Sequence, residues 1–264
     1  MPVSFARPPV SEVVAGLVFL PRTDVLIPHF GEFWAQSLKH DYPDVKHAPP
    51  VAPHGEQPAG DVATGLPLPR LWFMSPTESR LVQLQQDRIY ANWRQTGPED
   101  QYIRYEPLRE EAGRVVRLFD EYVTALTAEP LKAVRYEITY VNTLRQGREF
   151  VSASDLNNVF IDIGWNQRQR FLASPARIGA RFEFELPDAS GTLAVSLDPA
   201  RMAGSADDVL RLQLAAVATV PVTSRIEFLD WLDVAHEQIV RGFKDLTTPA
   251  MHEMWGLLDE GDQQ

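Results

Sequence analysis

The chain has no cysteine among its 264 residues. That absence excludes disulfide bonds, a thiol nucleophile and thiolate metal ligands, and it fits a reducing compartment. Long apolar runs are also missing, since none approaches the roughly 20 residues that a helix needs to cross a bilayer. The N-terminal stretch MPVSFARPPVSEVV lacks the charged start and apolar segment of a secretory signal. We therefore expect a soluble, cytoplasmic protein.

Basic residues are in deficit as well. The 25 Lys and Arg stand against 36 Asp and Glu, which gives a formal net charge of −11 and a pI near 5.0. Non-specific binding to nucleic acid needs clustered basic side chains that release counterions from the phosphates, and an acidic surface opposes this. We do not expect nucleic acid to be the main partner.

Strong catalytic and cofactor motifs are absent. There is no glycine-rich phosphate loop, no GxSxG and no HExxH, although two His-Glu pairs near the C-terminus begin like the last motif. His40, His47 and His54 recur every seven residues, but a proline-rich stretch without a carboxylate pattern makes a poor metal cage. The sequence therefore predicts no catalytic residue, no metal and no cofactor. An enzyme whose site leaves no local signature is the alternative.

Apolar periodicity divides the chain into strands and helices. Strands are predicted over residues 8–20, 71–74, 132–145, 177–186, 192–197 and 209–220. Helical spacing predicts helices over residues 28–40, 106–128, 152–163, 224–245 and 249–258, the third capped by Ser154 or Asp155. Residues 42–70 hold seven prolines and three glycines, which predicts an extended loop.

Most of these strands alternate between apolar and polar residues. In the strand over 177–186, Phe182 and Phe184 are expected to face the core, while Arg181 and Glu183 face outwards with Arg135 and Glu137 of the strand over 132–145. Asn142 interrupts the inner face of that strand, so it requires a hydrogen-bonding partner there.

This alternation favours antiparallel sheet with one face covered. The expected fold class is α+β: a mostly antiparallel twisted sheet with long helices on one face. The order strand, helix, strands, helix recurs in residues 1–130 and 131–264. We expect two α+β halves in one compact unit, and duplication of a strand-helix-strands-helix unit is a hypothesis.

The stretch from Leu81 to Gln95, LVQLQQDRIYANWRQ, is long, β-prone at both ends and unusually polar. Its apolar residues change phase, since Val82 and Leu84 fall in one register and Ile89 in the other. One strand with a β-bulge within residues 85–88 would bring them to the same core face. The opposite, open face would display the candidate residues for binding a ligand or partner: Gln83, Gln85, Arg88, Tyr90, Asn92 and Arg94.

Four stretches carry a family resemblance: PPVSEVVAGLVF at 8–19, the QQDR and NWR run at 85–94, ITYVN at 138–142, and HEQIVRGFKDLTTPAMHEMWG at 236–256. Together they resemble an uncharacterised, sporadically distributed bacterial protein family with N-terminal PPVxEV and C-terminal HExIxxxFxxLT…WG motifs. The resemblance spans nearly the whole chain. It implies no assigned activity and no catalytic residues, and its sporadic occurrence implies a defence or mobile-element gene cluster.

The leading functional hypothesis is a non-catalytic binding or regulatory protein that uses the polar open sheet face for a protein partner or for self-association. An ordinary solvated face is the plainer interpretation of the same residues. If the face is covered instead, each unpaired polar group would cost roughly 1–3 kcal/mol, so partners for these side chains must exist.

The competing hypothesis is an enzyme or small-molecule-binding protein with a pocket between sheet and helices. Asp87, Arg88 and Tyr90 would then bind a small polar or anionic ligand through charge-assisted hydrogen bonds. A third hypothesis is a purely structural subunit that pairs with itself through the sheet face.

Overall fold

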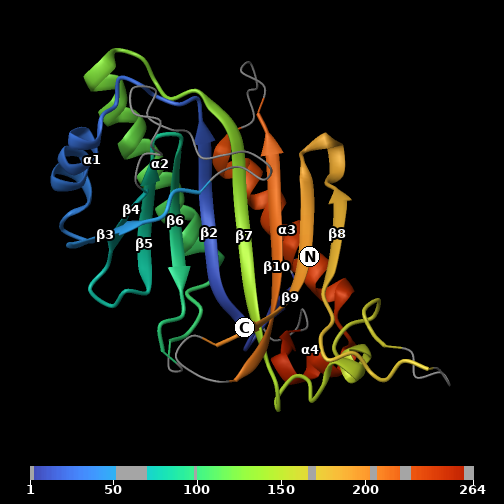
Figure 1. Ribbon diagram of the computed structural model, residues 1–264. Coiled ribbons are helices and arrows are strands. Elements are labelled where there is room, and N and C mark those ends of the chain that lie inside the picture. Colours follow the sequence, from blue (N-terminus) through green and yellow to red (C-terminus); the bar gives the residue numbers. More distant parts are fainter. Residues whose placement is uncertain are drawn as a thin grey trace. The chain divides into compact units, whose positions relative to one another are not determined.

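The computed structural model describes residues 3–51, 70–97, 100–165, 171–202, 207–220 and 227–258. Within these ranges the fold is α+β, an open antiparallel sheet of nine strands with two long helices packed against it (Figure 1). The predicted fold class is therefore confirmed. In sheet order the strands are β3 (Asp44–Ala48), β4 (Arg70–Met74), β5 (Arg80–Gln85), β6 (Arg88–Arg94), β2 (Val10–Phe19), β7 (Ala133–Arg145), β10 (Asp208–Thr219), β9 (Thr192–Arg201) and β8 (Ala180–Glu185).

The long helices lie where the apolar spacing predicted them. The helical segments are α1 (Ile27–Phe33) with a π-helical turn over Trp34–Leu38, α2 (Tyr105–Thr127), the 3₁₀ segments η2 (Ala153–Asn158) and η3 (Pro187–Ala189), α3 (Phe228–Leu246) and α4 (Pro249–Trp255). A separate ladder pairs β1 (Ser4–Phe5) with β11 (Leu257–Leu258).

The chain divides into two compact units. Unit 1 comprises Met1–Glu12, Thr139–Ala216 and Asp233–Gln264, and unit 2 comprises Val13–Ile138 and Val217–Leu232. β2, β7, β10 and α3 each contribute residues to both units. The division of the sequence into halves at residue 130, and the duplication, stay predictions.

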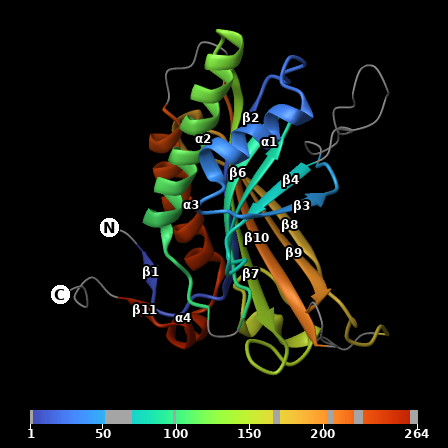
Figure 2. The same cartoon turned by 90° about the vertical axis from the view of Figure 1, so that its left-hand side faces the viewer.

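In unit 2, α2 packs on β6 and carries an apolar face (Figure 2). Phe119 of that face contacts Phe19 of β2 and Phe33 of α1, with ring centroids 5.8 and 5.0 Å apart. Gly113 permits close contact with the first turn of α3, because a Cβ there would lie 3.0 Å from a methyl carbon of Leu229. The beginning of α3 therefore covers the same face of the sheet as α2.

In unit 1, the inner side chains of β7 and β9 meet the C-terminal part of α3. Leu193, Val195 and Leu197 of β9 are buried, and Tyr140 of β7 hydrogen-bonds His236 of α3, Oη to Nδ1, at 2.9 Å. Asn142 is buried and donates from Nδ2 to the carbonyl of Leu212 at 3.3 Å. The partner that the sequence required for this asparagine is thus confirmed.

The stretch from Leu81 to Gln95 is a hairpin and not one bulged strand. β5 pairs with β6 up to Gln85 opposite Arg88, which leaves Gln86 and Asp87 as a two-residue loop. The predicted bulge is wrong, and the change of chain direction explains the change of phase. The loop has no left-handed residue, and the last residue of β2 supports it: the N–H of Phe19 donates to the carbonyl of Asp87 at 2.8 Å.

Smaller differences from the predicted elements also have local causes. Phe184 is 44% exposed, because β8 is the last strand of the described sheet. The cap of η2 is Ser152, whose N–H donates to Asp155 at 2.7 Å. Inside the predicted loop over residues 42–70, residues 44–48 form β3, and residues 52–69 lie outside the described residues.

Candidate functional site

The six predicted site residues lie on the β5–β6 hairpin of unit 2. Gln83 stands opposite Tyr90, and Gln85 stands opposite Arg88. Side chains two apart along a strand point to the same face, so all six residues share one face, as the sequence predicted. We call this set the polar row: Gln83, Gln85, Arg88, Tyr90, Asn92 and Arg94.

The polar row is covered and not open. Its first five residues expose between 2% and 7% of their surface, and Arg94 is half-buried. The expected open polar face is therefore wrong for this part of the sheet. Val51, just beyond β3, contributes to the cover, because its N–H donates to Gln85 Oε1 and its carbonyl accepts from Gln85 Nε2, both at 3.0 Å.

The amides of the polar row bond to one another and to β4. Gln83 Nε2 donates to Asn92 Oδ1 at 2.8 Å, and Gln83 Oε1 accepts from Arg70 Nη1 at 2.8 Å and from Trp72 Nε1 at 3.2 Å. A buried amide without partners would cost about 1–3 kcal/mol. These bonds remove that cost, which is the outcome required for a covered face.

The charge of Arg88 is matched by its neighbour in the chain. Arg88 donates from Nε and Nη2 to the two carboxylate oxygens of Asp87 at 2.9 and 2.6 Å, and the side chains are only 4% and 9% exposed. Gln85 Nε2 adds a bond to the same carboxylate at 3.2 Å. Both charges are thus compensated inside unit 2, and the predicted anion-binding role of Arg88 finds no support in this geometry.

Tyr90 reaches over a neighbouring strand. Its hydroxyl donates to Glu137 Oε2 on β7 at 2.6 Å, although β2 lies between β6 and β7. The position beneath it on β2 is Gly16, where a Cβ would stand 2.6 Å from Tyr90 Cδ1. Glycine in a strand often marks such a close approach. Burial, then the nearby Glu137 charge, raises the pKa of the Tyr90 phenol well above its usual value.

Arg94 at the end of the polar row bonds outside it. Its Nε donates to the carbonyl of Glu78 at 2.9 Å, and its guanidinium lies 5.8 Å from the ring centroid of Trp72. All six side chains therefore have partners within unit 2. The polar row is a buried network that fixes the hairpin to its neighbours, and it leaves little capacity for an external ligand.

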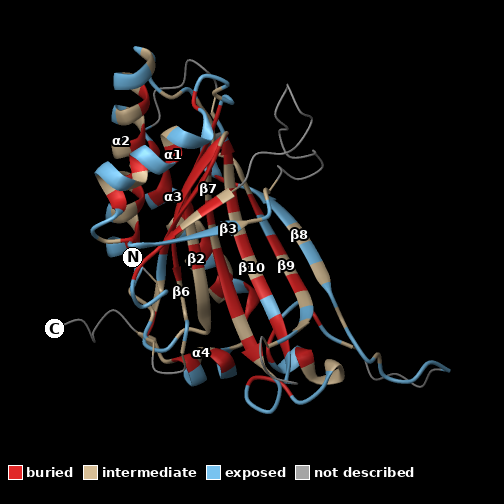
Figure 3. Ribbon diagram, turned by 60° about the vertical axis from the view of Figure 1, so that its left-hand side comes forward, coloured by how far each residue is buried: buried red, intermediate tan, exposed pale blue. Residues whose placement is uncertain are grey.

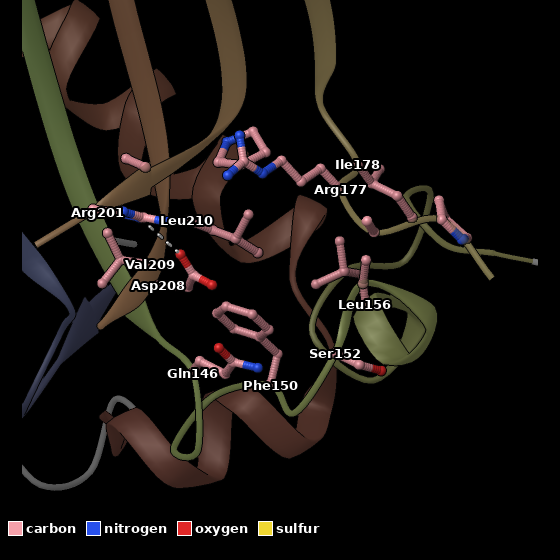
Figure 4. A pocket seen from close by; sticks show the side chains of 15 residues that line it. Gln146, Phe150, Ser152, Leu156, Arg177, Ile178, Arg201, Asp208, Val209 and Leu210 are labelled. Carbon is pink, nitrogen blue, oxygen red and sulfur yellow. Dashed lines mark ion pairs between the residues drawn. The ribbon is translucent and has the colours of Figure 1, made fainter. Parts of the chain in front are cut away.

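A ligand-sized hollow lies instead in unit 1, at the ends of β9 and β10 beside η2 (Figure 4). Its volume is about 470 Å³. The lining comes from the turn after β7, from η2, from the approach to β8, and from the end of β9 and the beginning of β10. Its buried apolar members are Phe150, Leu156, Val209 and Leu210. We call this hollow the unit 1 pocket.

Two arginines and one carboxylate border the unit 1 pocket. Arg201 and Asp208 form a loose, exposed ion pair at 3.8 Å, drawn as a dashed line in Figure 4. Arg177 extends over the pocket from the segment that leads into β8 (Figure 4). Within the described part of the chain, Arg177 has neither a carboxylate partner nor a hydrogen bond. Its charge is available to a ligand.

The sequence offered no signal for this pocket. Its lining is drawn from residues 146–156, 175–178, 199–201 and 208–210, and none of these segments carries a recognised motif. Among the described residues, no group of three or more His, Asp or Glu could hold a metal ion, and His54 lies outside them.

The fold and the pocket define an α+β protein with an open antiparallel sheet and a hollow of ligand size. Comparisons with protein-family models, with curated proteins and with solved structures find no match to this chain. The resemblance to a sporadic bacterial family therefore stays a prediction. No helix in the described ranges combines the length and the apolar character needed to cross a bilayer.

Proposed function

We propose that this protein is a non-catalytic binding protein that takes a small organic anion with an apolar body into the unit 1 pocket. The supporting observation is the lining itself, where the buried surfaces of Phe150, Leu156 and Leu210 lie beside the cation of Arg177, which has no carboxylate partner among the described residues. Ligand sites usually combine a mostly apolar hollow of about 300–1,000 Å³ with a few polar groups that orient the ligand. A location in the cytoplasm, consistent with the lack of cysteine, is part of this proposal.

The chemistry of the lining favours binding over catalysis. Its described residues include no histidine, and the hydroxyl of Ser152 donates to Asp155 while it caps η2. Burial acts to raise the pKa of Asp155, but N–H bonds from Val151 and Ser152 outweigh it and hold that pKa below its usual value. Asp155 is therefore a poor base for activating the serine.

Binding can be tested with a panel of aromatic and aliphatic monocarboxylates and their matched primary alcohols. We expect the carboxylates to bind the wild-type protein and the alcohols to bind far more weakly, as measured by titration calorimetry. Arg177→Met should lower carboxylate affinity about tenfold to a hundredfold, since a hydrogen bond to a charged group contributes about 1.5–3 kcal/mol.

Arg211→Met is the matched control. Arg211 is exposed on β10, next to the lining residue Leu210 and outside the lining. Because Arg211 follows Leu210 directly on the strand, its side chain points to the opposite face of the sheet, so this substitution should leave binding unchanged. The proposal is wrong if no carboxylate binds the wild-type protein, or if both arginine variants bind it equally well.

A further inference from the structure

The outer edge of β8 in unit 1 is free among the described strands. β8 pairs with β9 on one side and ends the described sheet on the other. Figure 3 shows β8 largely in the exposed colour, beside a β9 that alternates between buried and exposed residues. Such an edge presents unpaired N–H and C=O groups that can template another strand.

The register of β8 with β9 shows which backbone groups point outwards. The N–H of Leu186 donates to the carbonyl of Gly191 at 2.8 Å, two residues along the ladder from the pair Phe184 with Leu193. Hydrogen-bonded pairs alternate every two residues in an antiparallel ladder, so Phe182 and Phe184 bond towards β9. The N–H and C=O groups of Arg181, Glu183 and Glu185 therefore point to the free edge.

The β8 sequence, Ala-Arg-Phe-Glu-Phe-Glu, is complementary to itself in one antiparallel register. With a two-fold axis through Phe182, Arg181 of each copy stands opposite Glu183 of the other, and Ala180 stands opposite Phe184. This register also lets the outward backbone groups of Arg181 and Glu183 bond to each other. A shift of the axis by one residue would place either two glutamates or two arginines opposite each other at the axis.

Opposite charges across a strand pair attract, whereas like charges repel. Charges on an edge strand therefore oppose pairing with most other strands, and here they favour one particular partner. Among the described residues, Arg181 has one loose ion pair, with Asp198 at 3.5 Å, and the two side chains are 74% and 51% exposed, so Arg181 is available for the second copy.

Apolar surface on β8 adds to the complementarity. Phe182 and Phe184 stack with ring centroids 6.3 Å apart. Phe184 is exposed, although it lies on the same face of the sheet as the buried Leu193 and Leu197 of β9. In the proposed register the Phe182 rings of the two copies meet at the axis, and each Phe184 lies against Ala180. Cross-strand aromatic pairs of this kind stabilise sheets.

We infer that the occupant of this edge is a second copy of the chain, joined β8 to β8 in an antiparallel two-fold dimer. The contact is isologous, so it closes on itself and does not propagate into a fibre. The contact spans five residues of each strand, so the area that it buries is small for a protein interface. Dimerisation should therefore depend on protein concentration.

Charge reversal at β8 tests the register. We expect sedimentation equilibrium to show a concentration-dependent wild-type dimer, and Arg181→Glu to weaken it at least tenfold by placing two glutamate pairs opposite each other. The double exchange Arg181→Glu with Glu183→Arg restores both opposite pairs and should restore the dimer. Arg117→Glu, on an exposed turn of α2, is the control that should leave it intact.

A single cysteine gives a second readout, since the chain has none of its own. Residue 182 of the two copies would form a non-hydrogen-bonded pair with Cα atoms about 4.5 Å apart, within disulfide range. Phe182→Cys should therefore cross-link under mild oxidation. Phe184→Cys should not, because its counterpart lies about 13 Å along the strand.

Three results would overturn the inference. The first is a wild-type protein that stays monomeric at every concentration. The second is a double exchange that fails to restore the dimer although its melting curve matches the wild type. The third is equal cross-linking at positions 182 and 184, which would indicate random collision or another register. None of these results depends on ligand binding in the unit 1 pocket.

Discussion

The β5–β6 hairpin of unit 2 and strand β8 of unit 1 share the same alternation of apolar and polar residues, yet they differ in whether the polar side chains are buried. In the hairpin, the polar side chains are buried and bonded to one another. In β8, the charged side chains are exposed, and the described part of the chain offers them one loose ion pair, between Arg181 and Asp198. Alternation therefore fixes which residues share a face and does not fix whether that face is covered.

What stands opposite each side chain explains the difference. Gln83 of the hairpin faces Tyr90 and lies one diagonal from Asn92, so long polar groups meet across the ladder. Arg181 of β8 faces Ser196 and reaches the diagonal Asp198 only in a loose, exposed pair at 3.5 Å, and Glu183 faces Ala194, which cannot neutralise a charge. A polar row can be buried where its own partners are within reach, and it stays in water where they are not.

The comparison also predicts where substitutions are costly. A buried network has no solvent to replace a lost partner, whereas an exposed strand does. Changes on the polar row should therefore lower the free energy of unfolding by several kcal/mol, and changes of the same chemistry on exposed surfaces should be nearly silent.

The largest effect is expected from Gly16→Ala in β2. A Cβ at this position would stand 2.6 Å from Tyr90 Cδ1 and 2.7 Å from Tyr90 Cα, and it would meet the carbonyl oxygen of Ile89. Because two of these atoms are backbone, the strands must separate. We expect a loss of about 3 kcal/mol or more in the free energy of unfolding, measured by guanidinium chloride denaturation.

Gly31→Ala is the control for this substitution. Nothing lies within 4 Å of a Cβ built on Gly31, which sits in α1. Alanine is the better helix former, so this variant should be neutral or more stable by up to about 1 kcal/mol. Equal stability of the two variants would mean that Tyr90 does not cross β2 closely.

The next largest effect is expected from Arg88→Met. Of the partners that the described residues supply, it leaves the buried carboxylate of Asp87 with the bond from Gln85 Nε2 alone. Hydrogen bonds to charged groups contribute about 1.5–3 kcal/mol, and an uncompensated buried charge adds a desolvation cost, so we expect a loss of about 2–3 kcal/mol. Denaturant unfolding followed by circular dichroism measures it.

Arg117→Met repeats the chemistry on an exposed pair. Arg117 and Glu121 lie 3.3 Å apart on α2, and both side chains are well exposed. Exposed pairs contribute about 0–1 kcal/mol, so the control should differ little from the wild type. A loss for Arg88→Met as small as that of the control would contradict the buried network.

Much of the fold follows from local pattern. The strict alternation of β7 and the apolar stripe of α2 placed both elements within a residue of their observed ranges, and the stripe of α3 placed the end of that helix within a residue. The pattern even identified Asn142 as a buried residue that needed a partner. These elements are long and strongly periodic, which is where local reasoning is most informative.

The hairpin was missed because its loop lacks the usual signal. Two-residue hairpin loops favour glycine or asparagine with positive φ, and Gln86 and Asp87 offer neither. Bonds to the end of β2 and the chain just after it stabilise this loop instead: the N–H of Phe19 donates to the carbonyl of Asp87, and the carbonyl of Arg22 accepts from Gln86 Nε2. Those contacts are far apart in sequence, so no local rule could supply them.

The burial of the polar row was missed for the same reason. The bonds that cover Gln85 and anchor Tyr90 come from Val51 and Glu137, which lie 34 and 47 residues away along the chain. The unit 1 pocket is likewise assembled from separate segments, and Arg177 becomes distinctive because none of the described residues places a carboxylate beside it. Partners over long sequence separation decide between a buried network and a ligand site.

The smallest effect concerns the single bond from Tyr90 to Glu137. Glu137 is partly exposed, so water can replace the lost donor in Tyr90→Phe, and we expect a loss of about 1 kcal/mol at neutral pH. The dependence on pH is more diagnostic. The phenol has a raised pKa in the folded protein, and in the unfolded chain it ionises near pH 10.

Below pH ~10 the phenol is protonated in both states, so its full contribution to stability is present. Above that pH only the unfolded chain releases the proton, and stability falls as pH rises towards the folded pKa, by up to about 1.4 kcal/mol per pH unit. Burial also raises the pKa of Tyr42, which contributes in the same direction and remains in the variant. Denaturation between pH 9 and 11 should therefore show a shallower decline for Tyr90→Phe, and parallel declines would mean that Tyr90 titrates as an exposed phenol.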